Sequence, residues 1–190
     1  MSDLAEALKA ERLGAYARLR GGFPIPLAGA VYWAGLGVAG YFLPLKAWVL
    51  IAFIASGSIF PLALLFAAIF RNPFMKDRTA VGSVLVPAFI SMVLFWPTVV
   101  VAYETAPELA RLILAIGMSQ HWPVIGWSYG RTALFSAHAI VRAVIVFYLW
   151  MQFPEHRTTW LPFSVAAVYL ATVLAIYVDS GAVRAKLAKA

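Results

Sequence analysis

The chain has 190 residues, of which 63% are hydrophobic and only 12% are charged. A soluble domain carries about a quarter charged residues, so this composition excludes an ordinary soluble domain and is typical of a membrane protein. Cysteine is absent, which excludes disulfides, thiolate nucleophiles and zinc–thiolate sites. The formal net charge is +7, but no contiguous basic patch carries interleaved aromatic residues, so we expect no nucleic-acid partner.

The first segment, residues 1–22, is predicted to form an amphipathic helix at the cytoplasmic membrane surface. Leu4, Leu8, Tyr16 and Leu19 recur there among charged residues, which is the pattern of such a helix. A long polar segment precedes the first apolar run, whereas a secretory signal begins with a short basic region, so we expect no cleavage.

Six apolar stretches follow, each close to the roughly 20 residues that a transmembrane helix needs. They predict a single membrane domain over residues 23–180, followed by a basic cytoplasmic tail over residues 181–190. The expected fold class is all-α, a polytopic membrane helix bundle of about six transmembrane helices. The predicted spans are residues 23–43, 47–70, 80–103, 107–128, 132–153 and 160–178.

The basic residues predict the orientation of the bundle. Those that flank alternate ends of the spans are Lys9, Arg12, Arg18, Arg20, Arg71, Lys76, Arg78, Arg131, Arg184, Lys186 and Lys189. The other connections contain only Lys46 and Arg157. Because cytoplasmic loops are enriched in Lys and Arg, we expect both termini to lie in the cytoplasm.

Proline interrupts several of the predicted spans, at Pro61, Pro87, Pro97 and Pro123. Each proline lacks a backbone donor and leaves a carbonyl that must find another partner in the membrane. We therefore expect broken helices that face protein or a cavity. The small residues over 28–40 favour tight packing within the bundle, with a dimer interface as the alternative.

Polar residues converge in the predicted fourth and fifth spans. Arg131, His138 and Arg142 are separated by seven and then four positions, so a helix would align them on one face. At 1.5 Å per residue, His121 and His138 would lie at a similar depth of roughly 10 Å on neighbouring antiparallel helices. Gln120 and Tyr129 are further candidates for hydrogen bonding in the same region.

Arg142 would lie about 15 Å deep, near the centre of the bilayer, where a charge costs at least about 2.5 kcal/mol. The acids Asp77, Glu104, Glu108 and Glu155 belong to loops or span ends, and only a displaced Glu104 could reach inward. This leaves open whether Arg142 pairs with Glu104. Without such a pair, the region has excess positive potential and would attract an anion.

A purely structural interpretation stays open beside this one. Arg142 would then bond to carbonyls freed by proline, the histidines would be neutral hydrogen-bonding residues, and Arg131 would only mark topology. Intramembrane ionisable residues are nevertheless candidates for a functional site by default.

Three segments resemble a known family: "GSIFPLALLF" at 57–66, "NP" at 72–73 and "SQHWPVIGWSYG" at 119–130. The chain resembles a family of small bacterial integral membrane proteins, the domain of unknown function number seven thousand and ten. The resemblance covers roughly residue 22 to the end of the sixth span. It implies a compact six-span protein of the bacterial inner membrane and a recurrent motif around His121, Pro123 and Tyr129. It implies no substrate and no catalytic role.

The sequence supports four functional hypotheses. The first is binding or transport of a small anion or anionic lipid headgroup between the fourth and fifth spans. Its site residues would be Gln120, His121, Tyr129, Arg131, His138 and Arg142. The second is a structural or assembly subunit of a membrane complex.

The third hypothesis is a lipid-modifying enzyme with a histidine as general base, but no acid–histidine pair or acidic metal cluster supports it. The sequence therefore does not decide whether the protein is an enzyme, but it favours a protein without enzymatic activity. The fourth is haem ligation by His121 and His138, with Gly117 making space for the ring. We predict no cofactor and no metal, and expect membrane lipids, an anionic ligand or other membrane subunits as partners.

Overall fold

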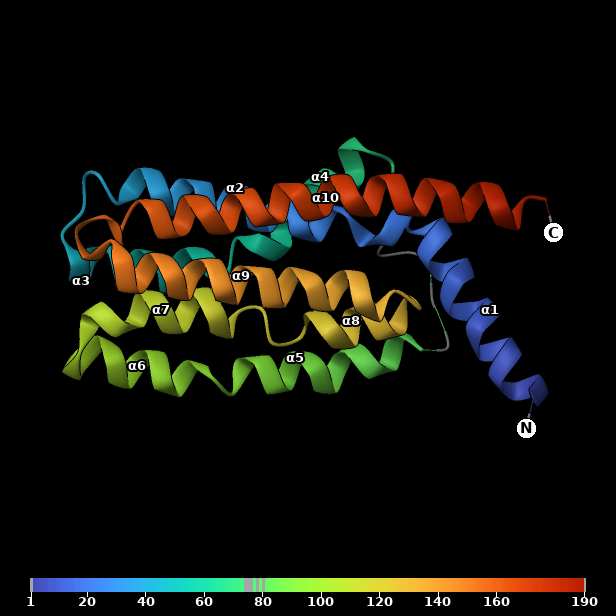
Figure 1. Cartoon of the computed structure of the whole chain (residues 1–190), viewed down its shortest axis with the longest axis horizontal. Coiled ribbons are helices and arrows are strands. Elements are labelled where there is room, and N and C mark those ends of the chain that lie inside the picture. Colours follow the sequence, from blue (N-terminus) through green and yellow to red (C-terminus); the bar gives the residue numbers. More distant parts are fainter. Residues whose placement is uncertain (1, 74–76, 78, 80, 190) are drawn as a thin grey trace.

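The computed structural model describes residues 2–73, 77, 79 and 81–189. Long helices lie side by side, and both chain ends lie at one end of the bundle (Figure 1). This confirms the predicted fold class, a helical bundle. The helices are α1 (Ser2–Arg18), η1 (Arg20–Gly22), α2 (Pro24–Ala39), α3 (Leu45–Ser56), α4 (Ile59–Ile69), η2 (Gly82–Val84), α5 (Leu85–Val93), α6 (Trp96–Thr105), α7 (Pro107–Gly117), α8 (Trp122–Ser128), α9 (Thr132–Gln152), η3 (Pro154–His156) and α10 (Trp160–Leu187).

Within the described residues, four helical segments are long and apolar enough to cross a membrane. They are Arg20–Ala39, Gly82–Thr105, Thr132–Gln152 and Trp160–Leu187. The pair α3 and α4 adds a fifth if it counts as one span bent by 49°. The structure therefore supports a membrane protein with several spans, but it does not establish the predicted number of six.

The stretch 107–128, predicted as the fourth span, consists of two short helices, α7 and α8, separated by residues 118–121. The break directly precedes Pro123, which has no N–H to donate to a carbonyl one turn earlier. Glu108 and Arg111 also lower the hydropathy of α7. Length and composition alone therefore do not identify this stretch as a membrane span.

Helices α2 and α10 form the closest pair in the bundle, and α9 lies between α10 and the shorter helices α7 and α8 (Figure 1). Small residues on α2 make the contact with α10 possible. A Cβ atom on Gly29 would lie 2.8 Å from the Tyr169 ring, and one on Gly37 would lie 2.8 Å from the Phe163 ring. The small residues of α2 thus serve packing within the bundle.

Helix α1 has a different burial pattern from the one the sequence suggests. Its first turns are exposed on all sides, and Leu4 is 76% exposed, whereas Ala15, Tyr16 and Ala17 at its other end are buried. Burial within the bundle thus increases towards the C-terminal end of α1. Its C-terminal half packs on the bundle through contacts with α10, and Arg12 donates a hydrogen bond to the carbonyl of Trp127 on α8.

At the other end of the chain, α10 continues to Leu187, past the predicted span end at residue 178. Most of the segment predicted as a basic tail is thus a continuation of the last helix. Gly181 does not interrupt it, and a glycine in a helix interior costs only about 1 kcal/mol relative to alanine.

Candidate functional site

The turn between α8 and α9 brings the two predicted histidines into one region. Gly130 has a φ of 66°, a conformation that glycine adopts without steric penalty. A Cβ atom on Gly126 would lie 2.6 Å from Cβ of Phe135, so the absence of a side chain lets the two helices meet. α8 and α9 consequently pack against each other on either side of this turn.

The imidazole rings of His121 and His138 both lie near the indole ring of Trp122. The Trp122 ring centroid is 5.8 Å from that of His121 and 4.3 Å from that of His138. Both histidines are buried, at 9% and 3% exposure. The two histidines therefore lie in one region, as predicted, and both contact Trp122.

The hydrogen bonds of His138 define where its proton lies. Its Nδ1 atom is 2.7 Å from Oγ1 of Thr172, and the Thr172 hydroxyl donates its single proton to the carbonyl of Val168 at 2.8 Å. Nδ1 must therefore be the donor to Thr172, which leaves Nε2 as an acceptor in the neutral imidazole. No hydrogen-bond partner contacts Nε2 among the described residues.

Arg142 is the central residue of α9 and is 0% exposed. Its guanidinium carbon lies 5.0 Å from the ring centroid of Trp33 and 5.2 Å from that of Tyr169. Nη1 donates a hydrogen bond of 3.0 Å to the Tyr169 hydroxyl. The side chain thus points into the bundle, between aromatic residues of α2 and α10.

Arg142 forms no ion pair with a carboxylate in the described part of the chain. Glu104, the candidate partner in the sequence, is exposed at the end of α6. The cation is instead held by two aromatic faces, each contributing about 2 kcal/mol when desolvated. These contacts offset part of the free-energy cost of burying the guanidinium, but they do not neutralise its charge.

Arg142 and five side chains near it form what we term the Arg142 cluster. Its members come from α2, α8, α9, α10 and the turn before α8. They are Trp33, His121, Trp122, His138, Arg142 and Tyr169. Several of their buried nitrogen atoms have no hydrogen-bond partner among the described residues: Nε1 of Trp33, Nδ1 of His121, Nε1 of Trp122, Nε2 of His138, and Nε and Nη2 of Arg142. Four of these atoms, from the two indoles and the guanidinium, are donors only.

An unsatisfied buried polar group is uncommon in a native protein and often marks a bound water or ion. The Arg142 cluster combines an uncompensated positive charge with several such donors in contacting side chains. Chemically, this donor excess suits a ligand that accepts hydrogen bonds and carries negative charge.

Arg131 lies at the other end of the predicted stripe and has an acidic partner. Its Nε is 2.8 Å from Oδ2 of Asp179 on α10, and its guanidinium lies 5.5 Å from the Tyr16 ring centroid. Burial and the neighbouring Asp179 carboxylate raise the pKa of Tyr16. This group joins α1, α9 and α10 and neutralises Arg131.

The remaining predicted residues are also outside the Arg142 cluster. Gln120 is exposed. Tyr129 is buried, but it packs against the rings of Tyr16 and Phe135, at 5.7 and 5.9 Å. Of the six predicted ligand-binding residues, the structure thus brings together His121, His138 and Arg142 only.

Sequence reasoning did not identify Trp33, Trp122, Tyr169 and Thr172 as parts of this site. Aromatic residues recur on every span, so no local signal distinguishes those that meet Arg142. Asp179 was identifiable in principle, because it lies at the same predicted end of the bundle as Arg131.

Comparisons with known proteins place the chain in a family. The sequence model described as "Family of unknown function (DUF7010)" matches residues 8–179. The chain belongs to this family, as its motifs suggest. No curated protein and no solved structure matches it.

Proposed function

We propose that this DUF7010 protein binds a small anion at Arg142 and serves binding or transport of that anion across a bacterial inner membrane. The observation that carries the proposal is a fully buried guanidinium with two unpaired donor atoms and no carboxylate partner in the described residues. An intramembrane charge of this kind is expensive unless it serves a pair or a ligand. An anion would supply the missing acceptor and the missing charge.

The depth of Arg142 favours a small anion over a lipid headgroup. Arg142 is ten residues from either end of α9, which corresponds to about 15 Å along the helix axis. A headgroup remains near the membrane surface, whereas a halide, nitrate or short carboxylate can reach the bilayer centre within a protein. The unpaired indole N–H groups of Trp33 and Trp122 would add hydrogen bonds to such a ligand.

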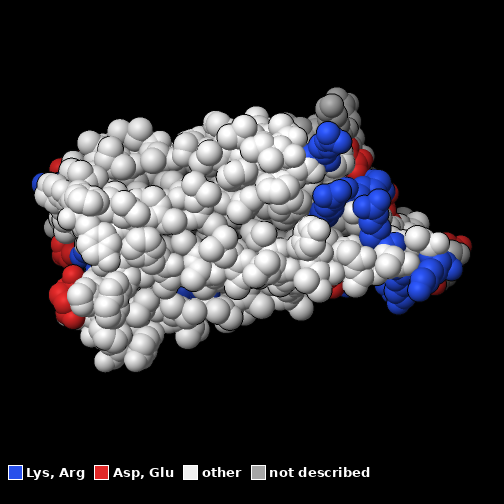
Figure 2. Space-filling model, turned by 90° about the horizontal axis from the view of Figure 1, so that it is seen from above, with Lys and Arg blue, Asp and Glu red and all other residues white. Residues whose placement is uncertain are grey.

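The charge distribution supports an orientation with both termini in the cytoplasm. Figure 2 shows Lys and Arg gathered mainly at one end of the molecule, whereas acidic residues occur at both ends. By the positive-inside rule, the basic end faces the cytoplasm. Its positive potential would concentrate anions on that side.

A structural role for Arg142 is the second candidate, and one observation favours it. The two cation–π contacts and the hydrogen bond to Tyr169 tie α9 to α2 and α10 without any ligand. On this account the protein would be a structural or assembly subunit, and the anion would have no effect on its stability.

The haem and enzyme hypotheses receive less support. Trp122 lies against both imidazoles, and the ring of Phe95 occupies the space beside Gly117, with atoms 2.6 Å from a Cβ placed there. A haem between the histidines would have to displace these rings. In the described residues, neither His121 nor His138 has a carboxylate at ion-pair distance that would activate it as a base.

Thermal unfolding of the detergent-purified protein in sodium salts tests the proposal. Chloride, nitrate and formate should be compared with gluconate, a bulky anion, at equal ionic strength. A ligand that binds only the folded state raises its stability by about 2.7 kcal/mol at a hundredfold excess over Kd. We expect at least one small anion to raise the unfolding temperature of the wild type, and Arg142→Gln to lose this response.

Arg111→Gln is the matched control. Arg111 is also a buried arginine, at 8% exposure, but its Nη1 donates to Oγ1 of Thr158 at 2.6 Å. The anion response should persist in this variant. An equal response of wild type and Arg142→Gln to every salt would contradict the proposal and favour the structural role.

A further inference from the structure

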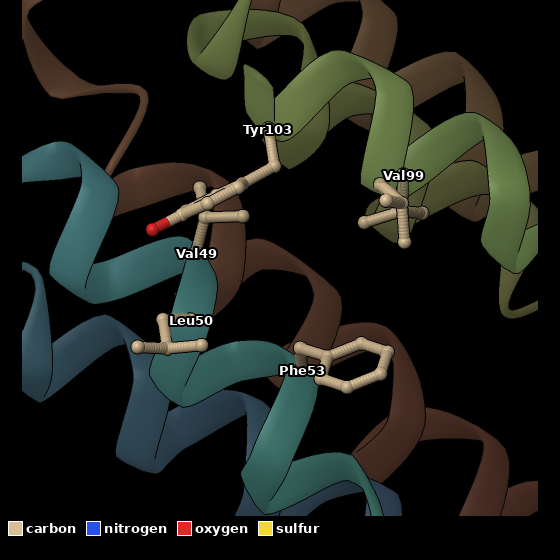
Figure 3. A pocket seen from close by; sticks show the side chains of 6 residues that line it. Val49, Leu50, Phe53, Val99 and Tyr103 are labelled. Atoms are coloured by element: carbon tan, nitrogen blue, oxygen red, sulfur yellow. The ribbon is translucent and has the colours of Figure 1, made fainter.

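An apolar groove lies between α3 and α6, away from the Arg142 cluster. Both helices pack on α7, and they leave a space of about 180 Å³ between them. Figure 3 shows the labelled side chains around this opening. The residues that line it are Val49, Leu50, Phe53, Val99, Val100 and Tyr103.

The groove has a buried floor and exposed walls. Val49 and Val99 are only 1% and 2% exposed, whereas Leu50 and Val100 are 47% and 53% exposed. These four side chains are aliphatic and Phe53 adds an aromatic ring, so the lining is apolar apart from the Tyr103 hydroxyl. In a membrane, hydrocarbon is the chemistry that fills such a surface.

The two ends of the groove differ in polarity. At one end, Nζ of Lys46 lies 5.9 Å from the ring centroid of Tyr103, and Lys46 is exposed in the first turn of α3. At the other end, Phe53 packs edge-on against Trp96, with ring centroids 5.0 Å apart. Lys46 precedes Val49, Leu50 and Phe53 by three, four and seven residues, so these side chains share one face of α3.

We propose that this groove binds one phospholipid, with an acyl chain between α3 and α6 and the phosphate at Lys46. The cation at one end and the aromatic Phe53 and Trp96 rings at the other match the polarity of a phospholipid along its length. Tyr103 beside Lys46 is a residue type enriched where headgroups meet hydrocarbon.

The dimensions of the groove favour an acyl chain over a helix of a second copy. A helix with its side chains is about 10–12 Å across, whereas the groove holds only about 180 Å³. The acidic residue nearest in sequence, Glu104, is exposed. Its carboxylate would repel a headgroup that carries a second negative charge besides the phosphate.

Native mass spectrometry of the full chain, incubated with phosphatidylethanolamine in detergent, measures retention of the lipid. Val100→Trp would fill the groove, and we expect at least a tenfold loss of retained lipid. Lys46→Gln should also reduce retention, and about fivefold for the anionic phosphatidylglycerol, because a basic residue near an anionic lipid surface contributes about 1 kcal/mol. Repeating the measurement with phosphatidylglycerol tests whether the phosphate is the feature recognised.

Val101→Trp is the matched control, because Val101 neighbours Val100 on α6, is 61% exposed and does not line the groove. It should retain the lipid as the wild type does. Equal retention by the Val100 and Val101 variants would overturn the proposal. A change from dimer to monomer in Val100→Trp, with lipid retention unchanged, would also overturn it and identify a second copy as the occupant. Since the groove is separate from Arg142, Val100→Trp should leave the anion response unchanged.

Discussion

At the scale of single residues, the spacing of His138 and Arg142 indicated correctly that both side chains face the same interior region. Both are buried, and both contact Tyr169. The sequence could not identify Tyr169 as the shared partner, because that contact depends on how α10 packs on α9. Arg131 has the same spacing pattern but lies at the helix end, where Asp179 pairs with it.

Thr172 is predicted to fix the orientation of the His138 ring. Thr172→Val would remove the acceptor of the Nδ1 proton and leave that buried group unpaired. The free energy of unfolding should fall by about 1–3 kcal/mol, measured by equilibrium unfolding in mixed micelles. Thr172→Ser keeps the hydroxyl and should lose much less, whereas equal losses in both variants would show that the hydroxyl is not the cause.

The raised pKa of Tyr16 predicts that the attachment of α1 depends on pH. Its pKa in the folded protein is raised by burial and then by Asp179. The folded state therefore holds this proton more tightly than the unfolded chain, whose tyrosine titrates near pH 10. The contribution of protonated Tyr16 to the stability of the folded state is fully present below about pH 10 and is lost as the pH rises above that value.

Limited proteolysis of α1 measures this dependence. Cleavage of the wild type should accelerate above about pH 10, whereas Tyr16→Phe should show little change over the same range. If both proteins become sensitive at the same pH to the same degree, another group is responsible for the detachment of α1.

At the scale of elements, proline correctly predicted where helices are interrupted. The breaks between α3 and α4, between α5 and α6, and between α7 and α8 come shortly before Pro61, Pro97 and Pro123. Each proline removes one backbone donor and crowds the preceding turn. Pro87 lies in the first turn of α5, where it is tolerated, and its predicted effect is correspondingly smaller.

The close packing of α2 on α10 gives a test at this scale. Gly29→Ala would place a methyl group 2.8 Å from the Tyr169 ring, and overpacking of this kind costs about 1–3 kcal/mol. Gly35→Ala on the same helix meets no atom within 4 Å. We expect thermal unfolding at a lower temperature for the Gly29 variant and an unchanged or higher temperature for the Gly35 variant. The reverse order would contradict the packing account.

For the whole molecule, composition and periodicity predicted the helical bundle correctly. The six predicted spans exceed the four or five candidate spans in the described residues. Hydropathy averages over a stretch and does not register that 107–128 is divided between α7 and α8. The groove between α3 and α6 was likewise not predictable, because it depends on both helices packing on α7.

Orientation in the membrane is also tested at this scale. The chain has no cysteine, so single cysteines can be introduced into the otherwise unmodified protein. Glu155→Cys lies at the end of the bundle opposite the termini, and Ala188→Cys follows α10. In intact cells, a membrane-impermeant maleimide should label the first variant only. Labelling of the second variant alone would reverse the proposed orientation.

The anion affinity of Trp33→Phe tests the account most directly. This change keeps an aromatic ring near Arg142 and removes the indole N–H, which has no partner among the described residues, together with part of the buried ring. If an anion accepts that N–H, its affinity, measured by salt titration of the unfolding temperature, should fall at least about tenfold. Stability without the anion should also fall, because the smaller ring leaves space in the buried core, so the affinity is compared between salts within each variant. Wild-type anion affinity in Trp33→Phe would contradict the proposal that this indole helps Arg142 to bind the anion.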